Sequence, residues 1–334
     1  MRKQTISQLR GPILRSVSRS FYLSIRFLPS KLRDPIALAY LLARATDTLA
    51  DTVDLEPSER LEHLRTLAES IQGRGDRDAM RKLIYSFAPL RKDTSERILI
   101  EQVWALLDWL DVIPAADRAD IREVLGKINE GQTLDVERFG IKTSIAAFQT
   151  AAELDRYTYL VAGSVGEFWT AIGERNLPEF ASRPDEQMNA LSVDYGKGLQ
   201  LINILRDSGS DLREGRCYIP AEELQSLGAT VAELLAQDSV GLPIIERWRK
   251  RAELGILAGI EYACAIVPWR VRLATVLPAL IGARTLALLR NADADTFRHG
   301  VKVSRREVRS ILLTMFTTLA SPRAIRGMFA ELSK

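Results

Sequence analysis

The sequence predicts an all-α fold, and three observations support this class. Apolar residues recur at spacings of three and four along most of the chain, which is the period of a helix with one buried face. The alternation of apolar and polar residues that marks half-buried strands is scarce. Breaks fall between the periodic segments, at Pro29, Pro57, Pro114, Gly140, Pro184, Pro220, Pro243 and Pro268.

The periodic segments give the expected helices in chain order. They lie near 12–28, 35–52, 57–72, 77–88, 93–110, 116–137, 144–172, 186–209, 242–266, 269–290, 304–318 and 322–332. The helix 35–52 has a readable start, because Asp34-Pro35 is typical of an N-cap followed by proline in the first turn. No repeat or low-complexity linker divides the 334 residues, so we expect a single domain over 1–334.

Composition excludes several function classes. The 46 basic and 43 acidic residues nearly balance at +3, which gives no general signature of nucleic-acid binding. The two cysteines, Cys217 and Cys264, lie far apart and lack partners at metal-binding spacing, which fits a reducing compartment. With only two histidines in the chain, zinc chemistry or a histidine-dependent triad is not expected.

No transmembrane segment is expected. The N-terminus lacks the apolar region of a secretory signal. No window reaches 18 uninterrupted apolar residues, and the closest, 255–268, contains Glu261 and is too short to cross a bilayer. The basic run Lys302, Arg305, Arg306 and Arg309 predicts a solvated face or one weakly attracted to a membrane. We therefore expect a cytoplasmic protein and leave a peripheral membrane contact open.

Two aspartate pairs, each spaced by four residues, are the main functional signal. On the expected helix 35–52, Tyr40, Arg44, Asp47 and Asp51 share one face while leucines and alanines cover the other. Both aspartates lie near the C-terminal end of this helix, where negative charge opposes the helix dipole. A purely structural helix gains nothing from that placement.

The second pair belongs to a longer polar stripe on the expected helix 186–209. Glycine is about 1 kcal/mol worse than alanine in a helix, so Gly209 predicts a frayed or bent turn at Asp211. The members of the stripe step by three or four residues: Gly196, Gln200, Asn203, Asp207 and Asp211.

Like charges at this spacing repel each other, whereas a divalent cation bound between them would make the net interaction favourable. Mg²⁺ prefers oxygen ligands and completes its shell with water and substrate phosphates. Two facing pairs would therefore hold Mg²⁺ ions that grip a diphosphate. A single pair alone would more often be a solvated helix face.

Weaker signals surround these pairs. The hydroxyls and guanidinium of Ser18-Arg19-Ser20 suit phosphate oxygens, and Arg216 could cover a diphosphate from a loop, although both also fit solvated turns. The helix segment 126–139 has an acidic face on which Asp135 points inward or to solvent. Small residues in 157–166 allow a close approach by another helix or by a hydrocarbon chain.

Together these runs resemble the squalene/phytoene synthase family, the head-to-head prenyl transferases. The resemblance covers about residues 15–290, which would be the catalytic core. The matching runs are Ser18-Arg19-Ser20-Phe21, Tyr40-x-x-x-Arg44-x-x-Asp47-Thr48-Leu49-x-Asp51, Tyr157-x-x-x-Val161-Ala162-Gly163-x-Val165-Gly166 and Gln200-x-x-Asn203-Ile204-Leu205-Arg206-Asp207-x-x-x-Asp211.

The resemblance implies an isoprenoid-synthase helical bundle around a central cavity, with prenyl diphosphates as substrates. We also expect a monomer. The resemblance further implies that Mg²⁺ is bound by Asp47, Asp51, Asn203, Asp207 and Asp211. Tyr157 and Tyr40 would act in catalysis together with Asp47 and Asp207, and Tyr159 is the alternative to Tyr157. The substrate-binding residues would be Ser18, Arg19, Ser20, Phe21, Arg44, Gln200, Arg206 and Arg216.

The implied reaction joins two farnesyl diphosphates into a cyclopropyl diphosphate, which NADPH would reduce to squalene. The run 47–51 is closer to squalene synthases, whereas 215–220 is closer to the bacterial phytoene or dehydrosqualene branch, so these products stay open. No dinucleotide fingerprint occurs, but family members that use NADPH do so without one. A helical scaffold that has lost activity is the non-enzymatic alternative.

Overall fold

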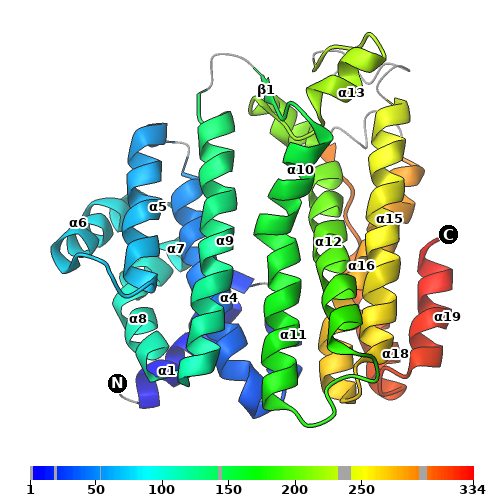
Figure 1. Cartoon of the computed structure of the whole chain (residues 1–334), viewed down its shortest axis with the longest axis horizontal. Coiled ribbons are helices and arrows are strands. Elements are labelled where there is room, and N and C mark those ends of the chain that lie inside the picture. The colour runs from blue at the N-terminus through cyan, green and yellow to red at the C-terminus, as the bar shows by residue number, and fades with distance from the viewer. Residues whose placement is uncertain (1–2, 19–20, 53, 142–144, 232–241, 293–298) are drawn as a thin grey trace. The chain divides into compact units, whose positions relative to one another are not determined.

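The computed structural model of the chain describes residues 3–18, 21–52, 54–141, 145–231, 242–292 and 299–334, and it confirms the all-α class (Figure 1). The described strands are only β1 (Ala146–Ala147) and β2 (Arg216–Cys217), which pair in parallel. The chain forms two compact units, one of residues 1–140 and 171–178 and one of 141–170 and 179–334. The single domain expected over 1–334 stays a prediction.

The first unit is a set of helices packed around α4. Leu38, Leu41 and Leu42 of α4 are fully buried, and α9 and α5 pack beside it. Its elements are α1 (Lys3–Gln8), the π-helix η1 (Leu9–Ile13), α2 (Leu14–Ser18), α3 (Phe21–Phe27), α4 (Ser30–Ala50), α5 (Pro57–Ile71), α6 (Arg77–Phe87), the 3-10 helix η2 (Ala88–Leu90), α7 (Thr94–Glu101), α8 (Val103–Val112) and α9 (Ala115–Phe139).

The second unit is built on the packed helices α12, α15 and α16. In Figure 1 α12 and α15 run side by side in green and yellow. Its elements, besides the two strands, are α10 (Ala151–Thr158), the π-helix η3 (Tyr159–Gly163), α11 (Ser164–Asn176, which continues into the first unit), α12 (Asp185–Arg213), α13 (Ala221–Ser226), α15 (Leu242–Ala265), α16 (Trp269–Arg290), α18 (Arg305–Thr317) and α19 (Pro322–Leu332).

The expected start of α4 at Asp34-Pro35 is wrong. The helix begins at Ser30, and the amides of Leu32 and Arg33 both bond to the carbonyl of Pro29. Asp34 instead forms an ion pair with Arg10 at 2.7 Å. Because Leu32 is buried, the extra turn is stabilised by packing, which outweighs the missing amide of Pro35.

The expected end of the helix at residue 209 is also wrong. The helix α12 continues without a break through Gly209 to Arg213, so Asp211 lies on a regular turn. Gly209 and Leu212 are both buried, and packing therefore overrides the low helix propensity of glycine. Other expected helices were too long: 93–110 is divided at Gln102, and 144–172 begins only at Ala151, after β1.

The small residues of 157–166 receive another helix. A Cβ on Gly166 would lie 2.1 Å from the carbonyl oxygen of Ser192, and one on Gly196 would lie 2.2 Å from that of Ala162. Both contacts join α12 to the η3–α11 segment, within the second unit. Of the two readings left open, a close helix contact is therefore the one found.

One helix among the described residues, α16, is long and apolar enough to cross a membrane. However, 72% of its most apolar window is buried inside the protein, as in the core helix of a soluble protein. The apolar segment 255–268 instead lies mostly in α15.

Candidate active site

Asp47 and Asp51 lie at the C-terminal end of α4, as predicted. Asp47 is half-buried and Asp51, the cap residue, is exposed. The side-chain amide of Gln132 on α9 donates to Asp47 Oδ1 at 2.5 Å. Gln132 is itself buried, so α9 fixes the position of the Asp47 carboxylate.

The electrostatic environment of Asp47 disfavours its negative charge. Burial and, after it, the neighbouring Asp51 carboxylate raise the pKa of Asp47 from 3.8 to about 6. Arg44 and the hydrogen bond from Gln132 oppose this shift without cancelling it. A bound cation near the two carboxylates would relieve the same repulsion.

Arg44, one helical turn before Asp47, is held by a carboxylate that the sequence analysis missed. Its guanidinium forms an ion pair with Glu96 Oε1 of α7 at 2.7 Å. The second oxygen of Glu96 accepts from Arg91, which also donates to Thr52 Oγ1 at 2.7 Å. Glu96 thus links Arg44 to the end of α4, and this pairing has no local sequence signal because the two residues are 52 positions apart.

The predicted residues that precede α4 are only partly described. Phe21 packs on the ring of Tyr40, with ring centroids 5.1 Å apart. The Tyr40 hydroxyl donates to the carbonyl of Val17 at 3.4 Å. Ser18 is buried and donates to the carbonyl of Leu14, so its hydroxyl is used inside its own helix. Arg19 and Ser20 lie outside the described residues.

The second aspartate pair, in the other unit, is paired with arginines. Arg206 forms two hydrogen bonds to the Asp207 carboxylate, at 2.8 and 2.5 Å, and this raises the pKa of Arg206. Arg216, on β2, pairs with the buried Asp211 at 2.9 Å. Both arginines predicted to bind phosphate thus pair with aspartates predicted to bind metal.

The amides of the α12 stripe lie next to this pair. Asn203 is exposed, and its side-chain nitrogen donates to Gln200 Oε1 at 3.3 Å. They lie one helical turn apart on the same face as Asp207, so the predicted stripe on α12 is continuous.

Tyr157 lies in an aromatic cluster of the second unit. Its ring is 5.4 Å from that of Phe148 and 5.4 Å from that of Tyr218, centroid to centroid. Tyr159 points elsewhere, because its hydroxyl donates to Glu167 at 2.9 Å. The cluster joins Tyr157 to the loop after β2, which brings the 215–220 run to this tyrosine.

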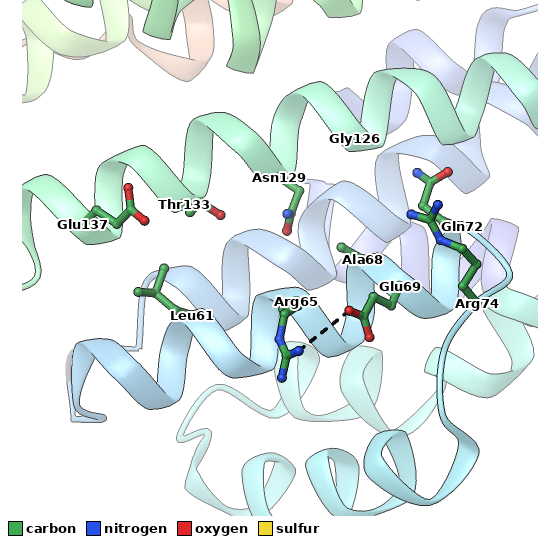
Figure 2. A pocket seen from close by; sticks show the side chains of 10 residues that line it. All are labelled: Leu61, Arg65, Ala68, Glu69, Gln72, Arg74, Gly126, Asn129, Thr133 and Glu137. Carbon is green, nitrogen blue, oxygen red and sulfur yellow. Dashed lines mark ion pairs between the residues drawn. The ribbon is translucent and has the colours of Figure 1, made fainter.

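A hollow of about 510 Å³ lies between α5 and α9 of the first unit (Figure 2). Asn129, Thr133 and Glu137 line it from α9, and Arg65 and Glu69 face it from α5. Gln132 projects about 100° away from Thr133 around α9, toward α4. The hollow is therefore separate from the aspartate pair.

The donor atoms fit the implied Mg²⁺. Carboxylate and amide oxygens are the ligands that this ion prefers, and Asp47 beside Asp51 forms a partly buried site with excess negative charge. Within either unit, no three His, Cys, Asp or Glu side chains of the described residues gather around one metal-sized point. The predicted convergence of the two pairs on shared ions, and the roles of the predicted site residues, stay predictions.

The chain matches a known protein family and several known proteins. The profile of a family described as squalene/phytoene synthase matches residues 14–307. The squalene synthase of Saccharomyces cerevisiae is 25% identical over 298 residues, which cover 88% of this chain and 63% of that protein. The 15-cis-phytoene synthase of Synechocystis sp. is 30% identical over 228 residues, 65% of this chain and 56% of that protein. The chain thus spans about three fifths of these relatives.

A solved structure supports the fold. The structure described as TcSQS in complex with the ligand E5700 matches with a TM-score of 0.78, covering 99% of this chain and 90% of that one. At 21% sequence identity, this likeness establishes that the two chains share a fold.

Proposed function

Because this chain belongs to the squalene/phytoene synthase family, we propose that it condenses two farnesyl diphosphates head to head through presqualene diphosphate, a cyclopropyl intermediate, and reduces this to squalene. The observation that carries the proposal is the carboxylate pair on α4. Asp51 lies close enough to Asp47 to raise its pKa, and Gln132 holds Asp47 in place. A bound cation would relieve the repulsion between the two carboxylates.

In the proposed first step, one farnesyl diphosphate loses its diphosphate and leaves an allylic cation. The double bond of the second substrate attacks this cation, and as the cyclopropane ring closes a proton passes to the departed diphosphate, which acts as the base. When bound, Mg²⁺ would neutralise charge on the departing diphosphate. Asp47, Asp51, Asp207 and Asp211, assisted by Asn203, would hold these ions.

The arginines would meet the oxygens of the diphosphates. Arg44 is positioned by Glu96, and Arg206 and Arg216 would leave their aspartates for phosphate as those aspartates bind metal. Bidentate contacts of a guanidinium suit this exchange, because phosphate and carboxylate present similar oxygen geometry.

Tyr157 would assist the loss of the proton in this first step, and the aromatic rings around Tyr157 would exclude water. Phe148 and Tyr218 pack against its ring, so this wall combines an apolar surface with one phenol. Tyr40, on α4, would contact the prenyl chain of the second farnesyl diphosphate. In the proposed second step, the cyclopropyl compound loses its diphosphate and accepts a hydride from NADPH, which gives squalene and NADP⁺.

The 15-cis-phytoene branch is the second candidate. The loop that contains Tyr218 contacts Tyr157, and the run 215–220 in this loop resembles that branch. The 15-cis-phytoene synthase of Synechocystis sp., which is 30% identical to this chain, also supports this candidate. Purified protein incubated with farnesyl or geranylgeranyl diphosphate, Mg²⁺ and NADPH should give a C30 hydrocarbon from farnesyl diphosphate, identified by mass spectrometry. A C40 product from geranylgeranyl diphosphate alone would reject our choice, and a C30 product unchanged by NADPH would indicate a dehydrosqualene synthase.

Thermal unfolding separates an enzyme from an inactive scaffold. Mg²⁺ with a non-hydrolysable farnesyl diphosphate analogue should stabilise the protein by about 2.7 kcal/mol at a hundredfold excess over the dissociation constant. No shift at saturating concentrations of both would favour the scaffold.

A further inference from the structure

The end of the second unit that carries α18 exposes a cluster of large apolar side chains. We call this the apolar tip: Val267, Leu313, Phe316 and Leu319 are 43%, 65%, 50% and 53% exposed, respectively. Leu313 and Phe316 lie one turn apart on the outer face of α18. The ring of Phe316 meets Trp269 edge-on at 6.1 Å.

Arg272 joins the two turns of the apolar tip. Its guanidinium donates to the carbonyl of Val267 at 3.0 Å and to that of Ala320 at 3.3 Å. The chain therefore brings the turn before α16 against the turn after α18, and their exposed side chains form one surface.

The turn after α18 presents Leu319 outward at a conformational cost. Leu319 and Ala320 both adopt positive φ, at 49° and 46°, which is unfavourable for residues with a Cβ. The turn buries Ala320 completely and leaves Leu319 half exposed. Because Ala320 is held inside, the turn keeps Leu319 on the surface of the apolar tip.

A row of cations continues the same face. Arg305 and Arg309 precede Leu313 at steps of four, and Arg306 lies beside them, so guanidiniums and apolar groups share one side of α18. We call these three residues the basic stripe. Among the described residues no carboxylate pairs with the basic stripe, because Glu307 points to α16, where it pairs with Arg284 at 2.9 Å.

The exposed leucines of α15 show the contrast. Leu254 and Leu257 also follow basic residues on a helix face. Those cations, however, are neutralised: Arg247 pairs with Glu223, and Arg251 with Asp155. The face of α15 therefore lacks the uncompensated charge that accompanies the exposed apolar side chains of α18.

We propose that the apolar tip and the basic stripe dock the protein on the surface of an anionic phospholipid bilayer. Arginines attract anionic headgroups, while phenylalanine, tryptophan and leucine enter the boundary between headgroups and acyl chains. A second copy of the chain fits less well, because a two-fold interface would place the uncompensated arginines against one another. This inference goes beyond the proposed reaction and concerns a different surface.

Flotation of the full chain with lipid vesicles, without substrate or Mg²⁺, tests whether the protein docks on an anionic bilayer. Protein should float with phosphatidylcholine vesicles that contain phosphatidylglycerol and remain unbound with phosphatidylcholine alone. Raising the salt should release it, because ions screen the arginines. Quenching of Trp269 fluorescence by bromine-labelled lipids, absent in Trp269→Phe, should report contact at this surface.

Two variants locate the contact. One arginine near a membrane contributes about fivefold to binding, so Arg305→Gln/Arg306→Gln/Arg309→Gln should weaken it at least tenfold, and Leu313→Ser/Phe316→Ser should do likewise. The matched control Leu254→Ser/Leu257→Ser, with side chains 67% and 44% exposed, should bind as the unmodified chain does. Thermal melts by circular dichroism should confirm that all three fold.

Two results would overturn the proposal. One is equal binding of all variants to anionic vesicles. The other is a dimer in sedimentation velocity that Leu313→Ser/Phe316→Ser dissociates, combined with no vesicle binding, which would assign the face to self-association. Neither depends on whether farnesyl diphosphate is the substrate.

Discussion

A carboxyl group that is partly buried beside a carboxylate resists ionisation, and Asp47 is in this position next to Asp51. In the metal-free protein the folded state therefore holds the Asp47 proton to about pH 6, whereas the unfolded chain releases it near 3.8. The protonated carboxyl group of Asp47 therefore contributes most favourably to the free energy of unfolding below pH 3.8, and this contribution is lost as the pH rises through about 6.

This linkage can be measured in chelator. Asp47→Asn should gain stability relative to the unmodified protein as the pH rises from about 4 to 6, by roughly 3 kcal/mol at most and then level off. Urea unfolding at several pH values checks it. Parallel profiles for Asp47→Asn and the unmodified protein would contradict our account.

The carboxylate of Glu96 pairs with both Arg44 and Arg91, and its side chain is 14% exposed. Glu96→Gln would remove the anion that both guanidiniums share, so it should cost about 1–3 kcal/mol of stability. If Arg44 binds diphosphate, KM should also rise. Denaturant unfolding and steady-state kinetics measure the two effects.

Glu101→Gln is the matched control on the same helix. Glu101 pairs with Arg97 at only 3.8 Å, and both side chains are about half exposed, so its loss should cost less than about 0.5 kcal/mol. Equal costs for the two variants would show that Glu96 does not hold Arg44 in solution.

At the scale of elements, helix existence was predictable and helix ends were not. The leucines and alanines of α4 and α12 set a period that the sequence displays, and these helices form where expected. Their ends depend on tertiary burial: Leu32 extends α4 backward, and Gly209 with Leu212 extends α12 forward. Such contacts join distant segments, so no local pattern predicts them.

Close helix packing gives a prediction at this scale. A Cβ on Gly198 of α12 would lie 2.7 Å from the Cα of Gly255 on α15, so Gly198→Ala must separate two helices. It should destabilise the protein by about 1–3 kcal/mol. Gly327→Ala on α19, where nothing lies within 4 Å, should instead stabilise by about 0.5–1 kcal/mol. Thermal unfolding of the two variants compares these signs, and a neutral Gly198→Ala would show that the helices can separate freely.

At the scale of the whole molecule, the sequence predicted which residues would be polar on each helix but not their partners. It marked Asp47 and Asp207 by spacing, yet Gln132 is 85 positions from the carboxylate to which it donates. It predicted Arg206 and Arg216 as phosphate ligands, but not that each pairs with an aspartate of the same site. Helical spacing indicates which side chains share a face, whereas these partners meet only through tertiary packing.

The predicted convergence of the two aspartate pairs can be tested by thermodynamic coupling between the units. If Asp47 and Asp207 share one cluster of ions with one diphosphate, either Asp47→Asn or Asp207→Asn should remove most of the stabilisation by Mg²⁺ and a diphosphate analogue, about 2.7 kcal/mol at a hundredfold ligand excess. The double variant should then lose little more than either single one, because residues acting on one ligand are not additive.

Separate sites would give a different result. Each single variant would then lose only its own part of the stabilisation, and the losses would add in the double variant. Asp185→Asn is a suitable control, since this exposed aspartate also lies on α12 but in its first turn, far along the helix from Asp207. Additive losses from Asp47 and Asp207 would contradict a shared cluster, and with it the proposed reaction, because the two substrate diphosphates would then have no common site at which to be ionised and joined.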